Sequence, residues 1–320
     1  MVLYQAEVVM KDVLSFGEPL VGFYPTGNTS LIEDGPVIKT WGGDTSNLAI
    51  GIARLGHSVS YLTKVGDDPF GEGFLRLWNS NGVDTSLVVV DQERRTGLYF
   101  VSFEGKRHRL TYYRSGSAAS SITRESVSAE LVARYRILHL SGISIGMGES
   151  ARETGKQLIE LARHVGTKVS FDVNYRAAQW KSIRIAAQVI MDTIGDGVDI
   201  LEITDDEMAA LGWGDSINGL AEKFPECGIL ILKQGPKGAT VLSEGKQLHF
   251  PAVPVEVKDT VGAGDSFDAG FITALLEGKQ VQEMGEFASA TAALTCTGTG
   301  PLEHMPTRAQ VDALLASSNR

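Results

Sequence analysis

Between residues 137 and 233 the chain alternates short apolar runs with longer stretches of helical periodicity. Apolar runs occupy residues 137–140, 168–172, 198–201 and 228–233, and helical stretches lie at 149–164, 184–194, 205–211 and 217–224. Strands separated by helices of this length call for parallel pairing, in a sheet that is covered by helices on both faces. The alternation therefore predicts an α/β fold with a mostly parallel central sheet, and residues 239–243 and 247–250 add an antiparallel edge.

Two other segments are typical of exposed strands and turns. Residues 20–41 carry short apolar stretches broken by Pro25, Gly27, Gly35 and Pro36, and residues 96–114 are typical of a hairpin with strands at 97–104 and 108–113. We expect these two segments to form a small sheet outside the main core. Residues 13–19, 42–95 and 115–317 then form the main α/β domain, and residues 1–12 are an N-terminal extension.

Composition narrows the class of protein. The 320 residues carry a formal net charge of −10, which argues against a general nucleic-acid or anionic-membrane surface. No long uncharged apolar run is present, and residues 1–11 do not resemble a signal peptide. The two cysteines, Cys227 and Cys296, are too few for a disulfide framework or a cysteine-ligated zinc site. We expect a soluble cytoplasmic protein without membrane or nucleic-acid partners.

The stretch from Asp259 to Phe267 contains the strongest single motif. Gly262 and Gly264, on either side of Ala263, allow a tight turn, and the helical run that follows makes this turn a helix N-terminus. Amide groups and the helix dipole there suit a phosphate or an oxyanion, and Asp265 lies beside them. The residues alone favour the simpler interpretation, a glycine turn capped by Asp. A Rossmann fingerprint lacks its third glycine here, and no Walker A pattern occurs.

Two further glycine-containing segments are ambiguous by themselves. Gly42 and Gly43 precede a helical stretch in which Asp44 and Asn47 offer hydrogen bonds to a polyhydroxylated ligand, but a plain capped loop explains the pattern equally well. The segment from Lys233 to Gly238 is, on its own, a strand followed by a hairpin turn. Neither segment assigns a function without the rest of the chain.

Taken in order, these motifs resemble the ribokinase-like (PfkB) carbohydrate kinases along nearly the whole chain. The N-terminal signature corresponds to Gly42-Gly43 with Asn47, to Arg54-Leu55-Gly56 and to Gly66-Asp67 with Gly71, and the C-terminal signature corresponds to Asp259–Phe267. The resemblance implies a three-layer α/β/α sandwich with a small β-sheet lid. It also implies a homodimer joined through the lids.

The resemblance assigns roles to individual residues. Asp265 becomes the general base, and Gly262, Ala263 and Gly264 form the anion hole. ATP is bound by Lys233, Gly235, Gly238, Gly262, Gly264 and Thr204, and Glu207 organises water around Mg²⁺. The family usually has an Asn-x-x-Glu motif where this chain has Thr204-Asp205-Asp206-Glu207. The resemblance leaves open whether a monovalent cation such as K⁺ is needed near residues 297–300.

Within the family, the chain most resembles the 2-keto-3-deoxygluconate kinases. The residues that carry this resemblance lie at 97–99, 112–118, 138–143 and 171–176, together with Trp180. A keto acid has a carboxylate that an arginine fork binds selectively. The resemblance implies a substrate site lined by Tyr99, Tyr112, Arg114 and Arg176, with Gly42, Gly43 and Asn47 at the substrate hydroxyls.

The predicted reaction is transfer of the γ-phosphoryl group of ATP to the terminal hydroxyl of 2-keto-3-deoxygluconate. The alternative is another kinase of the same fold that acts on fructose or a nucleoside-like sugar. A third hypothesis, from a different class, is a sugar-binding regulator without turnover. Gly262, Gly264 and Asp265 favour an enzyme.

Overall fold

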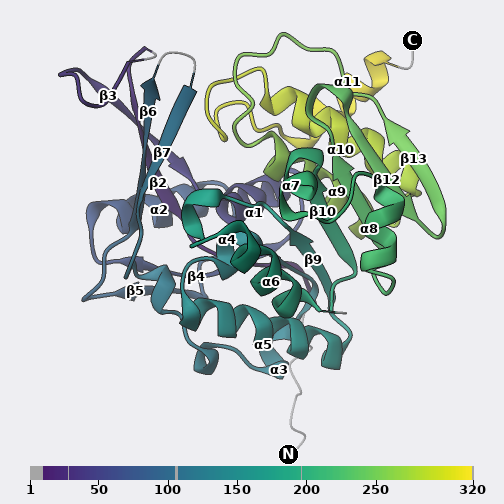
Figure 1. Ribbon diagram of the computed structural model, residues 1–320, viewed down its shortest axis with the longest axis horizontal. Helices are drawn as coiled ribbons and strands as arrows, with labels where there is room; N and C mark the ends of the chain where they lie inside the picture. Colours follow the sequence, from purple (N-terminus) through teal and green to yellow (C-terminus); the bar gives the residue numbers. More distant parts are fainter. Residues whose placement is uncertain (1–9, 28, 105–106, 196, 319–320) are drawn as a thin grey trace, which may run out of the picture.

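The computed structural model describes residues 10–27, 29–104, 107–195 and 197–318 of the chain. In that part, the larger sheet is mostly parallel, as predicted, and two antiparallel strands form one edge (Figure 1). Its strands, in spatial order, are β13 (Lys246–Phe250), β12 (Ala239–Ser243), β11 (Ile229–Lys233), β10 (Ile200–Thr204), β9 (Lys168–Asp172), β8 (Tyr135–Ser141), β1 (Lys11–Phe16), β4 (Val59–Gly66) and β5 (Val88–Asp91).

Helices cover both faces of this sheet, because its strands are apolar on both sides. Neighbouring strand residues point to opposite faces, and Val13 and Leu14 accordingly belong to two different core clusters. One cluster includes side chains from α3 (Ala129–Val132), α4 (Gly142–Ile145), α5 (Glu149–Val165), α6 (Ile183–Ile194), α7 (Asp205–Leu211) and α8 (Ile217–Lys223). The other includes side chains from α1 (Asp44–Arg54), α2 (Pro69–Ser80), α9 (Ala263–Leu276), α10 (Val281–Thr295) and α11 (Arg308–Ser318). The three-layer α/β/α arrangement is therefore confirmed.

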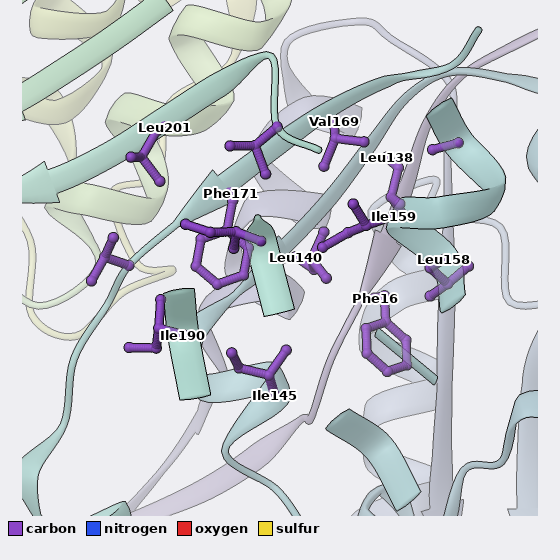
Figure 2. Close-up of a cluster of buried hydrophobic side chains, with 14 of the residues drawn as sticks. Phe16, Leu138, Leu140, Ile145, Leu158, Ile159, Val169, Phe171, Ile190 and Leu201 are labelled. Carbon is purple, nitrogen blue, oxygen red and sulfur yellow. The ribbon is translucent and has the colours of Figure 1, made fainter. Parts of the chain in front are cut away.

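The first cluster holds the centre of the sheet rigid. Figure 2 shows Leu140 and Phe171 of the strands packed near Ile145 and Ile190 of the helices. These side chains are fully buried. Close packing of this kind fixes the strand ends, and with them the polar residues that follow each strand.

The smaller sheet stands apart from the larger one, at the upper left of Figure 1. Its strands are β2 (Leu20–Pro25), β3 (Val37–Gly42), β6 (Gly97–Glu104) and β7 (Arg107–Tyr113), in the order β3-β2-β6-β7. Both segments predicted to lie outside the main core thus contribute to one sheet. The turn at Gly105-Lys106 lies outside the described residues. The pairing of two chains through this sheet stays a prediction.

Some element boundaries differ from the sequence-based expectation. The first strand begins at Lys11 rather than Val13, so the end of the expected N-terminal extension belongs to the sheet, and residues 1–9 lie outside the described part. Strand β10 begins at Ile200 rather than Val198, because its parallel register with β9 and β11 starts there. Strand β5 was not predicted. In the described part of the chain, every helix is too short or too polar to cross a bilayer.

Candidate active site

The predicted glycine turn lies at the N-terminus of α9. Gly262 has φ 82°, and a Cβ atom there would lie 2.6 Å from Pro301, so the position requires glycine. The Ala263 amide donates to the Thr260 carbonyl at 3.2 Å. Among the described residues, the amides of Gly264 and Asp265 have no protein acceptor. Two unpaired N–H groups at the positive end of a helix suit a phosphate group.

Asp265 lies in the first turn of α9, beside those amides. Its Oδ2 accepts a hydrogen bond of 2.7 Å from Asn47 Nδ2, which comes from α1. Burial, together with the negative charges of Asp44 and Asp172, raises the pKa of Asp265 to about 7, although the Asn47 bond and the Lys233 charge oppose the rise. A carboxylate with this pKa is suited to accept a proton at neutral pH.

The start of α1 brings a second glycine turn to the same place. Gly43 has φ 100°, and a Cβ atom there would lie 2.4 Å from the Glu18 carbonyl oxygen. Asp44 begins the helix and is buried; its Oδ2 accepts a bond of 3.1 Å from Asn174 Nδ2. Asn47, one turn later, reaches Asp265. The structure therefore brings the turn at Gly43 and the side chain of Asn47 close to Asp265.

Tyrosines of the small sheet face this region. The Tyr99 hydroxyl lies 2.9 Å from the Tyr24 hydroxyl, and the rings of Tyr99 and Tyr112 have centroids 6.2 Å apart. A Cβ atom at Gly42 would lie 3.3 Å from the Tyr99 hydroxyl, so the tyrosine packs directly against the glycine turn. Burial raises the pKa of both Tyr99 and Tyr112, which keeps their hydroxyls protonated.

Arg114 follows β7 and is buried, at 8% exposure. Its Nε lies 2.5 Å from Oε2 of Glu18, which is fully buried, and its Nη2 donates to the Ile143 carbonyl at 3.2 Å. Its Nη1 is also buried and has no partner among the described residues. Much of the positive charge expected to meet a substrate carboxylate is therefore balanced by Glu18, and one donor remains open.

Arg176 lies beyond the end of β9 and contacts the predicted metal-side residue. Its Nη1 donates to Glu207 Oε1 at 3.2 Å, and 41% of its side chain is exposed. Glu207 also accepts from the Thr204 amide at 3.1 Å, while Thr204 Oγ1 accepts from the Glu207 amide, a capping box at the start of α7. Thr204, Glu207 and Arg176 thus form one group that joins the expected metal side to the expected substrate side.

Lys233, expected at the nucleotide, points into the interior. Its Nζ lies within hydrogen-bonding distance of Asp172 and Asp268, and only 11% of its side chain is exposed. The ammonium group is therefore engaged by protein carboxylates. The following loop turns through two glycines with positive φ, 54° at Gly235 and 96° at Gly238, a conformation that glycine adopts without strain. A Cβ atom at Gly238 would lie 2.0 Å from the Phe250 carbonyl oxygen, so that position requires glycine.

The donor set bears on how a metal would be held. In the described ranges, no group of three or more His, Cys, Asp or Glu side chains is arranged to hold a metal ion. Mg²⁺ usually keeps several waters and is held by one or two carboxylates together with phosphate oxygens, so a single carboxylate such as Glu207 fits such an ion.

Several residues at the site were not singled out as site residues from the sequence. They are Glu18, Tyr24 and Asn174, together with the carboxylates around Lys233. A signal for some of them was present: Glu202 is a charged residue between Leu201 and Ile203 in β10, and Asp172 directly follows Phe171 at the end of β9. Asn174 also has φ 37°, an uncommon conformation for a residue other than glycine, but only the structure reveals it.

Comparison with known proteins identifies the family of the chain. The family model described as pfkB family carbohydrate kinase matches residues 10–308. Fructokinase-1 of Oryza sativa subsp. japonica is 32% identical over 318 residues, which cover 96% of this chain and 98% of the rice protein. The chain therefore has relatives along nearly its whole length.

Solved structures give the same result for the fold. The PfkB protein from Polaromonas sp. JS666 is 28% identical, with a TM-score of 0.85 over 95% of this chain and 99% of that one. The 2-dehydro-3-deoxygluconokinase from Thermotoga maritima is 23% identical, with a TM-score of 0.86 over 96% of this chain and 99% of that one. The match of motifs, fold and sequence leads to one conclusion: the chain belongs to the pfkB family of carbohydrate kinases.

Proposed function

We propose that this carbohydrate kinase transfers the γ-phosphoryl group of ATP to a primary hydroxyl group held beside Asp265. The observation that carries the proposal is the position of Asp265, next to two unpaired amides at the N-terminus of α9. A base and an anion site at one point are what phosphoryl transfer to an alcohol requires.

The residues act in a simple order. Asn47 orients the Asp265 carboxylate, which takes the proton of the acceptor hydroxyl as that oxygen forms its bond to phosphorus. The amides of Gly264 and Asp265 donate to the oxygens of the group being transferred. Tyr99 and Tyr112 enclose the acceptor and keep competing water away. Gly42 and Gly43 bring the backbone close to the acceptor hydroxyls.

The proposal also assigns residues to the nucleotide and to the metal ion. We assign the nucleotide to the turn at Gly262–Gly264, the backbone of Gly235 and Gly238, and Thr204, since the Lys233 ammonium is already engaged. Glu207 is the residue suited to hold Mg²⁺ through water. An Mg²⁺ ion held there would supply positive charge to balance that of the phosphates. The fructokinase from Xylella fastidiosa, a structure with the same fold, was solved with bound ATP. The resemblance does not decide whether K⁺ is needed near residues 297–300.

For the acceptor we propose 2-keto-3-deoxygluconate. Arg114 Nη1 is buried without a partner among the described residues, beside Tyr112, and Arg176 exposes two-fifths of its side chain near Asp265. A buried donor without an acceptor is costly, so a ligand oxygen is its expected partner. A carboxylate between the two arginines would meet this need.

Fructose is the second candidate, and the curated relatives favour it over the keto acid. Those relatives are fructokinases at about one-third identity, whereas the gluconate-type kinase is a structural neighbour at 23%. The Glu18 carboxylate beside Arg114 also favours fructose, because it already balances the positive charge of that arginine. A panel of acceptors decides: ADP release is measured with 2-keto-3-deoxygluconate, fructose, ribose and a nucleoside. A higher kcat/KM on fructose would contradict the keto-acid assignment, and sugar binding without ADP release would support a regulator.

Replacing Arg176 with glutamine tests the carboxylate directly. We expect Arg176→Gln to lower kcat/KM about tenfold or more for the keto acid and to change it little for fructose, because a charge-assisted hydrogen bond is lost only with the acid. The variant also frees Glu207, but that loss affects both acceptors equally, so the ratio of the two values is the measurement. Arg184→Gln, at an exposed arginine of α6, is the matched control. Equal losses on both acceptors would contradict carboxylate recognition.

The pH dependence of turnover tests Asp265 as the base. Since its pKa is raised to about 7, the active ionised form is lost as the pH falls through 7, and kcat/KM is expected to fall about tenfold per pH unit below that point. Initial rates are measured from about pH 5 to about pH 9 with Mg²⁺ in excess over ATP. An acid limb near pH 4, the range of an ordinary carboxylate, would mean that Asp265 is not the titrating base.

A further inference from the structure

A buried cluster of charges lies directly behind the proposed active site. Lys233 Nζ is 3.0 Å from Asp268 Oδ1, 3.2 Å from Asp172 Oδ2 and 3.6 Å from Glu202 Oε2. The side chains of Asp172, Glu202 and Asp268 are 6%, 0% and 1% exposed. One ammonium group thus connects three carboxylates in the protein interior.

The sheet register assembles this cluster. Phe171, Leu201 and Leu232 belong to the core on the α5 side, so the residues that follow each of them point to the opposite face, toward α9. Those residues are Asp172, Glu202 and Lys233, on three adjacent parallel strands, and Asp172 lies opposite Glu202 in the ladder. Asp268 completes the cluster from α9, three residues after Asp265 and on the same side of the helix.

The cluster contacts residues of the proposed active site at two points. A Cβ atom at Gly264 would have Lys233 Nζ as its nearest neighbour, at 3.5 Å, so the ammonium lies beneath the anion-binding turn. Asn174, two residues beyond Asp172, donates to Asp44, the carboxylate whose charge acts on Asp265. The helix that carries the base is therefore tied through one lysine to the ends of β9 and β11 and to the middle of β10.

Such a network is an inefficient way to stabilise a fold. Desolvation of buried ions offsets most of their attraction, and apolar side chains of similar size often serve stability as well. Burial raises the pKa of Glu202 and Asp268, and the Lys233 ammonium opposes that rise. The His139 side chain nearby is kept neutral, because burial lowers its pKa to about 4. A functional reason for keeping Lys233 charged in this place is therefore needed.

We propose that Lys233 is a positioning residue for phosphoryl transfer: it holds the first turn of α9 against the strand ends and supplies the buried positive charge that keeps Asp265 able to act as a base near neutral pH. This inference rests on the proposed function, in which Asp265 accepts the proton. It deepens that function by naming the residue that sets the proton affinity of the base.

The other charged groups around Asp265 do not substitute for Lys233. From α1 it faces Asp44 and the neutral Asn47, from the end of β9 it faces Asp172, and from the small sheet it faces the neutral Tyr99. Arg176 also acts on it, but is paired with Glu207. Two of the neighbouring groups are carboxylates that increase the proton affinity of Asp265. The loss of the Lys233 charge is therefore expected to raise the pKa of Asp265.

The test uses two variants with opposite expected effects. Lys233→Met is expected to move the acid limb of kcat/KM to higher pH by about one unit, because a nearby positive charge is lost. Asp172→Asn is expected to move it to lower pH by a similar amount, because a nearby negative charge is lost. Lys11→Met is the control, because Lys11 pairs with Asp84 at the start of β1, far from the strand ends that face Asp265. It is expected to leave the acid limb of kcat/KM unchanged.

A second readout does not depend on turnover. The carboxyl ¹³C resonance of Asp265, assigned by its absence in Asp265→Asn, is titrated in each variant and is expected to shift its midpoint in the same directions. Midpoints that stay constant, or that move the same way in both variants, would overturn the proposal. If Lys233→Met does not fold, Lys233→Met/Glu202→Gln removes one buried charge of each sign and takes its place. Opposite NMR shifts in a protein that phosphorylates no acceptor would support the charge effect and contradict the proposed function.

Discussion

Replacing Asp265 with asparagine is expected to lower kcat by about 10²-fold or more while the fold stays intact, because the general base is removed and its shape is kept. The carboxamide oxygen of the substituted side chain would still accept the hydrogen bond that Asn47 Nδ2 donates to Asp265. The measurement is kcat under saturating ATP and acceptor, together with the circular dichroism spectrum. Near-normal turnover would remove Asp265 from its role.

The same substitution has a predictable effect on stability. The pKa of Asp265 is raised in the folded state, so its ionised form is disfavoured there, and the carboxylate lowers the free energy of unfolding as the pH rises from about 4 through 7. Asp265→Asn has no such ionisation, so its Tm relative to the wild type is expected to increase over that range. Asp312→Asn, at an exposed aspartate of α11, is the control for both measurements.

Replacing Arg114 with methionine is expected to lower the free energy of unfolding by about 3–5 kcal/mol, since it leaves the fully buried Glu18 carboxylate without its cation. Glu18 also accepts a hydrogen bond from Ser117 Oγ, which alone does not balance the charge. The pair joins the residue after β7 to the segment after β1, so its loss loosens the small sheet from the large one. Urea denaturation at about pH 7 measures the change.

Two further variants serve as controls for the stability change in Arg114→Met. Glu18→Gln/Arg114→Met removes both charges and is expected to recover most of the lost stability. Arg76→Met breaks an ion pair with Glu72 whose side chains are 78% and 63% exposed, and it is expected to change stability by less than about 1 kcal/mol. A loss of that small size in Arg114→Met would show that the buried pair contributes no more than a surface pair.

The parts of the fold that followed from the sequence are those with local signals. Strand β9 and helix α7 have the predicted bounds, because apolar runs and capping residues define both ends. The turn at Gly262 was predicted because a helix N-terminus preceded by glycine has a local signature. Strand β5 was missed, since it is a short edge strand with two exposed valines at Val89 and Val90.

The site was predicted less completely, for a physical reason. Arg114, Arg176 and Lys233 were recognised as basic residues in the right motifs, but their partners come from other elements. Lys233 and Asp172 are 61 residues apart in the chain, and Arg176 and Glu207 are 31 apart. No local pattern reveals which carboxylate faces which cation, and that pairing decides whether a basic group is free for a ligand.

The sequence by itself therefore determined the α/β fold with its small second sheet, the glycine turn that carries Asp265 at a helix N-terminus, and the resemblance to carbohydrate kinases, because each depends on periodicity or on residues close together in the chain. Only the tertiary structure decided how the charges are shared: Glu18 balances Arg114, Glu207 holds Arg176, and three carboxylates enclose Lys233 beneath Gly264. Those pairings arise from strand register and helix packing, and they set the proton affinity of the residue on which the proposed chemistry depends.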